Sequence, residues 1–103
     1  MRRGEIWDVA TDPTGTTIRV AVLSGQAWNE GGSAQCVLLV RGHGVREVLP
    51  YIVATAETDP VTGILDMGWL SPVPTDAAVE YLGMLTGATL AKIADSLRRI
   101  YEL

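Results

Sequence analysis

Few side chains of this chain are suited to catalysis. Histidine and cysteine, two residue types that often act in catalysis, occur once each. His43 is the only histidine, and imidazole is the side chain best suited to proton transfer near neutral pH. Cys36 is the only cysteine, which excludes an internal disulfide and a zinc site built from several cysteines. Because Cys36 lies in the apolar stretch AQCVLLV, we interpret it as a buried residue rather than as a nucleophile. A Cys–His pair is conceivable, but a predicted strand separates the two side chains.

Arginine offers a second kind of chemistry, because its planar guanidinium binds phosphate and carboxylate groups. The chain has one lysine, Lys92, against seven arginines, although a high-GC genome would produce the same preference. Residues 1–50 hold five basic and five acidic side chains, whereas residues 51–103 hold three basic and seven acidic ones. The overall charge of −4 excludes a generally basic nucleic-acid binder. Arginines gathered locally in the first half could still bind a phosphate.

A small β-rich fold must position these side chains. The length of 103 residues predicts one domain, residues 1–103, with a modest core. Residues 34–40 are apolar on both faces and predict a central strand. Pro50 favours an edge position or a bulge for the strand that contains it. Gly68 predicts a further bulge in the strand over 64–71. We expect residues 25–33 to form a loop, since they include several glycines. Alternating apolar residues between turn residues predict strands over 4–10, 17–24, 34–40, 45–56 and 64–71.

The last part of the chain contains the clearest helical pattern. Thr86 is a candidate N-cap, and apolar residues recur at helical spacing over about residues 87–101. Upstream of this helix, two prolines, Pro72 and Pro74, precede Thr75, and we predict a short helix that starts at Thr75. A short strand over residues 83–85 is predicted to follow it. We therefore expect a mostly β fold, mainly an antiparallel sheet, with the C-terminal helix over one face.

No segment is a candidate for export or for a membrane span. The longest apolar runs, such as CVLLV, are far shorter than the ~18 residues that a spanning helix needs. The first residues contain no apolar run of signal-peptide length. We expect a cytoplasmic protein without a membrane partner.

The order of these motifs resembles one family. The opening MRRGEIWDV, the turn DPTG and the strand IRVAVLSG resemble the start of the MazF/PemK-type toxins of bacterial toxin–antitoxin pairs. The tail YLGMLTGATLAKIADSLRRIYEL is similar to the closing strand, cap and terminal helix of that family, and AQCVLLV lies where the family has its central strand. The resemblance covers essentially the whole chain. It implies an SH3-like small barrel (MazF/CcdB-like), a homodimer, and cleavage of single-stranded RNA without metal or cofactor, blocked by a cognate antitoxin.

In the chemistry that the resemblance implies, a ribose 2′-OH attacks its adjacent phosphate, which requires a base, an acid and a cation. The family's central arginine matches Arg19, which is implied to stabilise the phosphate charge and is a candidate proton donor. The proline that follows that arginine in the family is Val20 here. The family's hydroxyl residue at the end of the central strand falls near Arg41, where no hydroxyl is present. Arg41 and His43 are the candidates to replace it.

Other family positions also differ. An acid–amide pair in a later strand aligns with Gly68–Trp69, and the acidic residue of the first loop is missing unless Asp12 serves. These differences concentrate at the site rather than in the scaffold. They fit a ribonuclease with a rebuilt site, and they also fit a protein that kept the fold and lost cleavage.

Five residues are candidates for RNA binding. The resemblance places Trp7 in the barrel core and the two N-terminal arginines at its mouth, where they could contact RNA or serve only solubility. A tryptophan exposed beside two amides could stack on and read an unpaired base, or it could fold back onto the sheet. The candidates are Arg2, Arg3, Gln26, Trp28 and Asn29.

Two functions without RNA cleavage stay open. The CcdB-type toxins share this fold and act on DNA gyrase by protein contact, although RRIYEL does not resemble the end of their terminal helix. The chain could also be an SH3-like adaptor that binds a peptide. In either case the acidic second half favours a basic protein partner.

Overall fold

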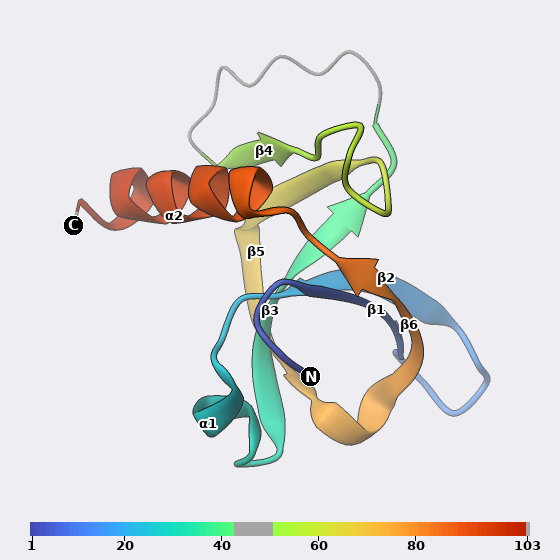
Figure 1. Ribbon diagram of the computed structural model, residues 1–103. Helices are drawn as coiled ribbons and strands as arrows, with labels where there is room; N and C mark the ends of the chain where they lie inside the picture. Colours follow the sequence, from blue (N-terminus) through green and yellow to red (C-terminus); the bar gives the residue numbers. More distant parts are fainter. Residues whose placement is uncertain (43–50, 103) are drawn as a thin grey trace.

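The computed structural model describes residues 1–42 and 51–102, and one antiparallel sheet dominates it (Figure 1). Its strands are β1 (Glu5–Ala10), β2 (Thr17–Val22), β3 (Ser33–Val40), β4 (Ile52–Ala54), β5 (Ile64–Pro74) and β6 (Ala78–Met84). The helices are α1 (Gln26–Asn29), the 3₁₀ turn η1 (Thr75–Ala77) and α2 (Gly87–Tyr101). The strands lie in the order β4-β5-β3-β2-β1-β6. The predicted antiparallel sheet with a C-terminal helix is confirmed.

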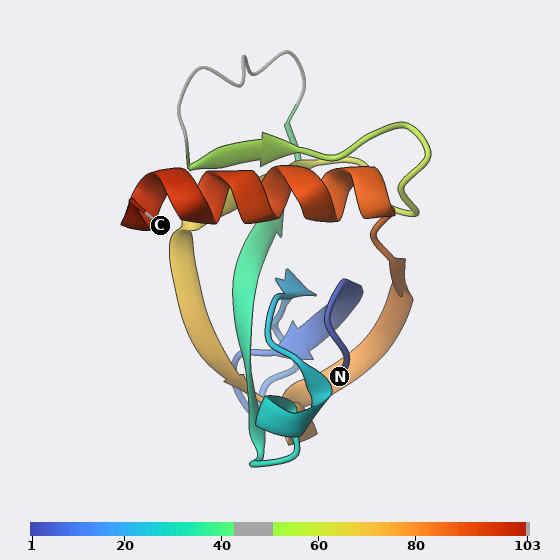
Figure 2. The same cartoon turned by 60° about the vertical axis from the view of Figure 1, so that its left-hand side comes forward.

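The sheet is strongly curved. The turn η1 joins β5, beside β3, to β6 at the far edge of the sheet, so one continuous stretch of chain bends around β1 and β2 (Figure 2). Helix α2 runs alongside β4, across the end of the curved sheet (Figures 1 and 2). This curvature gives β1 and β2 an enclosed position, with neighbours on both sides.

The predicted bulge at Gly68 is confirmed. Val37 of β3 pairs with Leu70, but the next residue, Leu38, pairs with Asp66. Residues 67–69 therefore have no partner on β3, and the strand bends there. The Oδ1 atom of Asp66 accepts a hydrogen bond from the backbone N–H of Gly68 at 2.9 Å, which satisfies one donor that the bulge would leave free.

The predicted helix from Thr75 is wrong beyond its first turn. Only η1 is helical, and residues 78–84 form β6, which includes part of the strand predicted over 83–85. The physical reason is that β1 offers a row of backbone partners, and pairing with β1 satisfies the backbone of residues 78–84 without a helix. The predicted loop over 25–33 contains the short helix α1. Of the strand predicted over 45–56, Ile52–Ala54 forms β4, while Pro50 lies outside the described residues.

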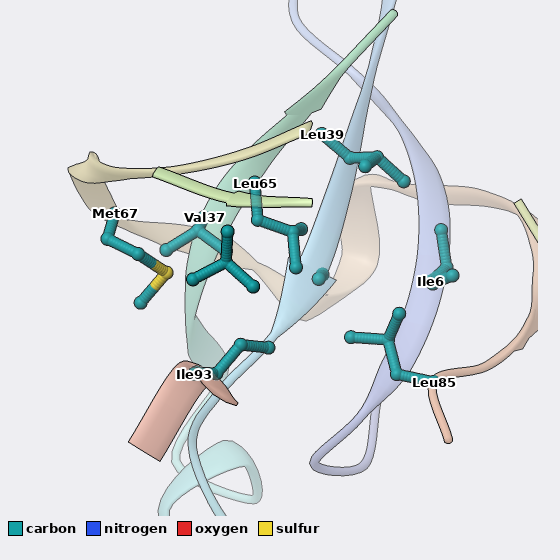
Figure 3. Close-up of a cluster of buried hydrophobic side chains, with 9 residues drawn as sticks. Ile6, Val37, Leu39, Leu65, Met67, Leu85 and Ile93 are labelled. Atoms are coloured by element: carbon teal, nitrogen blue, oxygen red, sulfur yellow. The ribbon is translucent and has the colours of Figure 1, made fainter. Parts of the chain in front are cut away.

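Both faces of the sheet carry apolar clusters. Figure 3 shows side chains of β1, β3 and β5 converging with Ile93 of α2. The opposite face contains Val20, Val22 and Cys36, with the partly buried Trp7 packed against them. Alternation along each strand produces this division, and it explains why residues 34–40 are apolar on both faces. Trp7, which the resemblance placed in the barrel core, is instead partly buried and packs against the second cluster.

The thiol of Cys36 is expected to be unreactive in the folded protein. Its side chain is fully buried, and burial raises its pKa to about 11, although the positive N-terminus opposes this slightly. Because the thiolate is the nucleophile, iodoacetamide at pH 8 should label Cys36 only in urea, as measured by mass spectrometry. Labelling of the native protein at the rate of a free thiol would contradict the interpretation of Cys36 as a core residue.

Position 83 requires a glycine for two reasons, its backbone conformation and the closeness of Pro60. Its φ is +128°, and a Cβ atom there would lie 2.7 Å from Pro60. Gly15 has a similar φ of +93° but nothing within 4 Å, so it serves as the matched control. We expect Gly15→Ala to cost about 1 kcal/mol and Gly83→Ala about 3 kcal/mol of unfolding free energy, since strain and overlap add. Urea denaturation measures both, and equal losses would show that Pro60 does not matter.

Among the described residues, no helix is both long and apolar enough to cross a membrane.

Candidate functional site

Arg19 lies on β2 directly opposite Asp8 of β1. The Nε atom of Arg19 donates to Oδ1 of Asp8 at 3.0 Å, and Nη2 donates to Oδ2 at 3.4 Å. The two side chains are 36% and 18% exposed. The pair is thus partly withdrawn from water, where an ion pair is stronger than on an open surface.

The strand period explains why these charges gather at one place. Side chains two residues apart share a face of the sheet. The apolar residues Ile6, Ala21 and Leu39 belong to the first core cluster. Two positions along β1 and β2, the same face continues with Asp8 and Arg19, and Arg41 directly follows the end of β3. At the margin of the first apolar cluster, the sequence therefore places one aspartate and two arginines.

These residues surround a hollow of about 250 Å³, called here the Arg19 hollow. It brings together two of the predicted catalytic residues, Arg19 and Arg41, while the third, His43, lies outside the described residues. The remaining lining includes two threonines, Thr17 and Thr62. The complete lining is Asp8, Thr17, Arg19, Leu39, Val40, Arg41, Val61 and Thr62.

Three polar residues of the hollow were missed by the sequence analysis. Thr17 could have been found, because it lies two positions before Arg19 and shares its face. Asp8 could have been found by pairing the first two strands across the DPTG turn. Thr62 comes from the segment between β4 and β5, and no sequence signal connects that segment to β2. Thr17 and Thr62 are hydroxyls in the region where the sequence offered none at Arg41.

Arg19 remains positively charged under all physiological conditions. Its pKa is raised above the ordinary value by the hydrogen bond to Asp8; partial desolvation opposes this, and the charges of Asp8 and Glu80 add to it. A guanidinium that holds its protons more tightly stabilises anionic charge well but releases a proton poorly. The hydrogen bond to Asp8, which raises the pKa of Arg19, therefore favours charge stabilisation over the proton-donor role considered for Arg19.

A second hollow of about 260 Å³ lies at the start of the chain, and we call it the N-terminal hollow. It collects three of the predicted RNA-binding residues, Arg2, Gln26 and Asn29, and its complete lining is Met1, Arg2, Gln26, Asn29, Glu30 and Thr75. Arg2 and Arg3 are exposed. Trp28 of α1 is 62% exposed, so it does not fold back onto the sheet.

Asn29 differs from its neighbours because its amide is already bonded within the protein. Its Nδ2 donates to the carbonyls of Met1 at 2.8 Å and Ser24 at 3.1 Å, and its Oδ1 accepts from the Ser24 hydroxyl. Asn29 is also 5% exposed. Any contribution of Asn29 to a ligand would therefore be indirect, through the position of α1.

Asp12 is engaged in its own turn. Its Oδ1 accepts hydrogen bonds from the hydroxyl of Thr14 and from the backbone N–H groups of Thr14 and Thr16. The hydroxyl of Thr14 contributes most to lowering the pKa of Asp12. The carboxylate closes the β1–β2 turn, and it is absent from the lining of both hollows. Among residues 1–42 and 51–102, no group of three or more His, Cys, Asp or Glu side chains is arranged to hold a metal ion.

Comparison with protein-family models and with curated proteins finds no match for the chain. Solved structures do match. A mycobacterial endoribonuclease in complex with its cognate antitoxin is 25% identical, with a TM-score of 0.85, over 100% of this chain and 96% of that chain. The MazE–MazF complex of Deinococcus radiodurans is similar at 20% identity, with a TM-score of 0.79, over 100% and 96% of the two chains. The toxin MazF-mt6 of Mycobacterium tuberculosis has 13% identity and a TM-score of 0.75, over 96% and 97%.

These likenesses extend along the whole chain rather than over a shared sheet alone. They include the terminal helix and the connection from β5 through η1 to β6, because each alignment covers nearly all of both chains. The resemblance seen in the opening and closing motifs is therefore confirmed by structure, and the chain has the fold of the MazF-type toxins.

Proposed function

We propose that this chain is the toxin of a toxin–antitoxin pair and acts as an endoribonuclease on single-stranded RNA. The observation that carries the proposal is the Arg19 hollow, which is lined by two arginines and two threonines in a fold shared with a mycobacterial endoribonuclease. Protein binding without cleavage, the alternative, is not favoured by these neighbours. A guanidinium pair suits a phosphodiester because its forked donors match two phosphate oxygens.

The proposed reaction uses a nucleophile that the RNA supplies. A base accepts the proton of the ribose 2′-OH, whose oxygen attacks the adjacent phosphorus, the bond from phosphorus to O5′ breaks, and O5′ takes up a proton from an acid or from water. The products are a 2′,3′-cyclic phosphate and a 5′-OH end. Arg19 and Arg41 would stabilise the extra negative charge of the five-coordinate phosphorane. Thr17 and Thr62 would donate to its oxygens, and His43 stays a candidate for one proton transfer.

The N-terminal hollow extends the proposed RNA path. Arg2 precedes β1 and Asp8 lies in the second half of that strand, so the two hollows lie toward different ends of β1. Arg2, Arg3 and Gln26 would contact the RNA backbone and base edges there, with Asn29 holding α1 in place. Trp28 offers an exposed ring on which a base can stack.

Replacing Trp28 with alanine is expected to weaken RNA binding by about tenfold or more, because stacking on one aromatic ring contributes ~1–3 kcal/mol. Folding stability should not change, since the ring is mostly exposed. Fluorescence anisotropy with a labelled oligonucleotide measures the affinity, and Trp28→Phe, which keeps an aromatic face, is the control. Equal affinities for wild type and both variants would remove Trp28 from the proposed path.

We further propose a single-domain homodimer in the cytoplasm that is bound by a cognate antitoxin. The support for the antitoxin is the mycobacterial complex. An acidic and apolar segment of such a partner would suit the Arg19 hollow, because it could occupy the position of a phosphate and exclude RNA. Light scattering of the purified protein measures the oligomeric state, and a monomer at micromolar concentration would contradict the dimer.

The proposed function is tested by inducing the chain in bacteria and mapping RNA ends. We expect growth arrest together with new 5′-OH ends at a short recurrent sequence, and neither effect from the Arg19→Ala variant at equal protein level. Growth arrest without new RNA ends would favour the alternative, a toxin that acts by protein binding. A folded, well-expressed protein with no effect on growth or RNA would contradict both.

A further inference from the structure

The contact between Arg19 and Asp8 leaves one edge of the guanidinium open. Asp8 accepts from Nε and from Nη2, which is the side of the guanidinium. A guanidinium has five N–H donors, so both Nη1 protons and one Nη2 proton remain. That free edge has the same two-donor geometry that binds a phosphate, and Arg19 lines the hollow.

Asp8 itself has little freedom to act on a substrate. Its two carboxylate oxygens both face the guanidinium, and its side chain is only 18% exposed. Glu80, directly opposite Asp8 on β6, also faces this group, and its charge acts on Arg19. No hydrogen bond between Glu80 and Arg19 is seen, so Asp8 alone sets the direction of the guanidinium within the described residues.

We propose that Asp8 is a positioning residue, which holds Arg19 side-on so that the free edge of the guanidinium meets the scissile phosphate. This inference rests on the proposed RNA cleavage. A long arginine side chain without a partner samples many rotamers, and ordering it at the moment of reaction costs free energy. Because the contact with Asp8 already orders the Arg19 side chain in the folded protein, no ordering free energy is needed when the RNA reacts. Asp8 thus acts through Arg19 and makes no bond to the RNA.

The test compares Asp8→Ala and Asp8→Asn. Asp8→Ala should lower kcat by about 100-fold, the size of effect expected from misplacing a catalytic group by about 1 Å. Asp8→Asn keeps an acceptor for the 3.0 Å bond to Nε and should recover most of the loss, within about tenfold of wild type, because a neutral acceptor is roughly half as strong as a charged one. KM should change less than kcat in both variants. Glu80→Gln, a neighbouring carboxylate that does not bond Arg19, is the matched control and should keep wild-type kcat.

A second measurement separates this inference from the proposed function. The Nε–H of Arg19 can be followed by NMR in the free protein, and its exchange with water should be slow in wild type and Glu80→Gln, intermediate in Asp8→Asn and fast in Asp8→Ala. Slow exchange in a wild-type protein that cleaves no RNA would contradict the nuclease proposal but would confirm the contact between Asp8 and Arg19. Fast exchange in wild type would overturn the positioning role directly.

One kinetic outcome would replace positioning by a different role. If Asp8→Asn is as inactive as Asp8→Ala, and the rate of the wild type falls at acidic pH in a way that both variants lose, Asp8 removes the 2′-OH proton itself. If Asp8→Ala keeps wild-type kcat with a folded structure, Arg19 needs no positioning partner. Either result overturns the inference.

Discussion

Replacing Arg19 with alanine is expected to lower the rate of RNA cleavage by about 10³-fold, the loss seen when a preorganised donor to a developing oxyanion is removed. The reason is that Arg19 is held by Asp8 at the edge of the hollow and donates to charge that appears only in the transition state. KM should rise less than kcat falls. The measurement is single-turnover cleavage of a defined oligonucleotide.

Two control variants make this result specific. Arg19→Lys keeps the charge but lacks the forked donors, so it should recover only a small part of the rate. Arg99→Ala removes another arginine that pairs with an aspartate, since Arg99 Nε lies 3.3 Å from Asp95 Oδ2 on the exposed side of α2. That variant should cleave like wild type. If Arg19→Ala also cleaves like wild type, Arg19 does not stabilise the transition state, and Arg41 and His43 are the next candidates.

Replacing Asp59 with alanine is expected to destabilise the fold by about 3–5 kcal/mol. The side chain is 6% exposed and accepts hydrogen bonds from the backbone N–H of Ala56 and of Thr86, both at 2.7 Å, and from the Thr89 hydroxyl. Its loss leaves these donors without an acceptor, at a cost of about 1–3 kcal/mol for each donor that stays buried. Because Thr86 is the N-cap of α2, the start of that helix should loosen first. Urea denaturation measures the loss.

Asp12 provides the matched control for Asp59. It also accepts hydrogen bonds from two backbone N–H groups and one threonine hydroxyl, but it lies in an exposed turn. Its donors can bond to water when the carboxylate is removed, so Asp12→Ala should destabilise the protein far less. Equal losses for the two variants would show that burial of the Asp59 network is unimportant.

The Asp59 network also predicts how stability depends on pH. Burial tends to raise the pKa of Asp59, but the hydrogen bonds from Thr86, Thr89 and Ala56 together lower it below its usual value. A carboxyl whose pKa is lower in the folded state stabilises the fold at every pH above its unfolded pKa of ~3.9. That contribution is lost as the pH falls through the folded pKa. The difference in stability between wild type and Asp59→Ala should therefore be constant above about pH 5 and shrink in more acidic solution.

The sequence predicted those features that depend on local pattern. Helix α2 and its cap Thr86 followed from apolar spacing and from a hydroxyl at the first turn, and the bulge at Gly68 from a glycine inside a strand. Residues 78–82 were misread because their strand depends on pairing with β1, whose paired residues lie 69 or more positions earlier in the chain. Two prolines and Asp76 gave a helical start signal, and the distant partner strand overrode it.

The candidate site was predictable only in part for the same reason. Arg19 was found through the family resemblance, and Arg41 through its place at the end of the central strand. Pairing the first two strands could have indicated that Asp8 lies beside β2. Its contact with Arg19, however, depends on the register of the folded sheet. Thr62 enters the hollow from the β4–β5 segment, and such a contact between distant segments leaves no periodic signal in one sequence.

The most direct test of the central claim uses purified protein, a long single-stranded RNA and EDTA. The account predicts discrete fragments that carry 5′-OH and 2′,3′-cyclic phosphate ends, cleavage that stops when the single ribose before the scissile phosphate is replaced by 2′-deoxyribose, and no fragments from Arg19→Ala. Cleavage that survives the 2′-deoxy substitution would contradict the proposed attack by the 2′-OH. The absence of cleavage by folded wild-type protein across RNAs that contain all short sequences would contradict the assignment of the Arg19 hollow as a ribonuclease site.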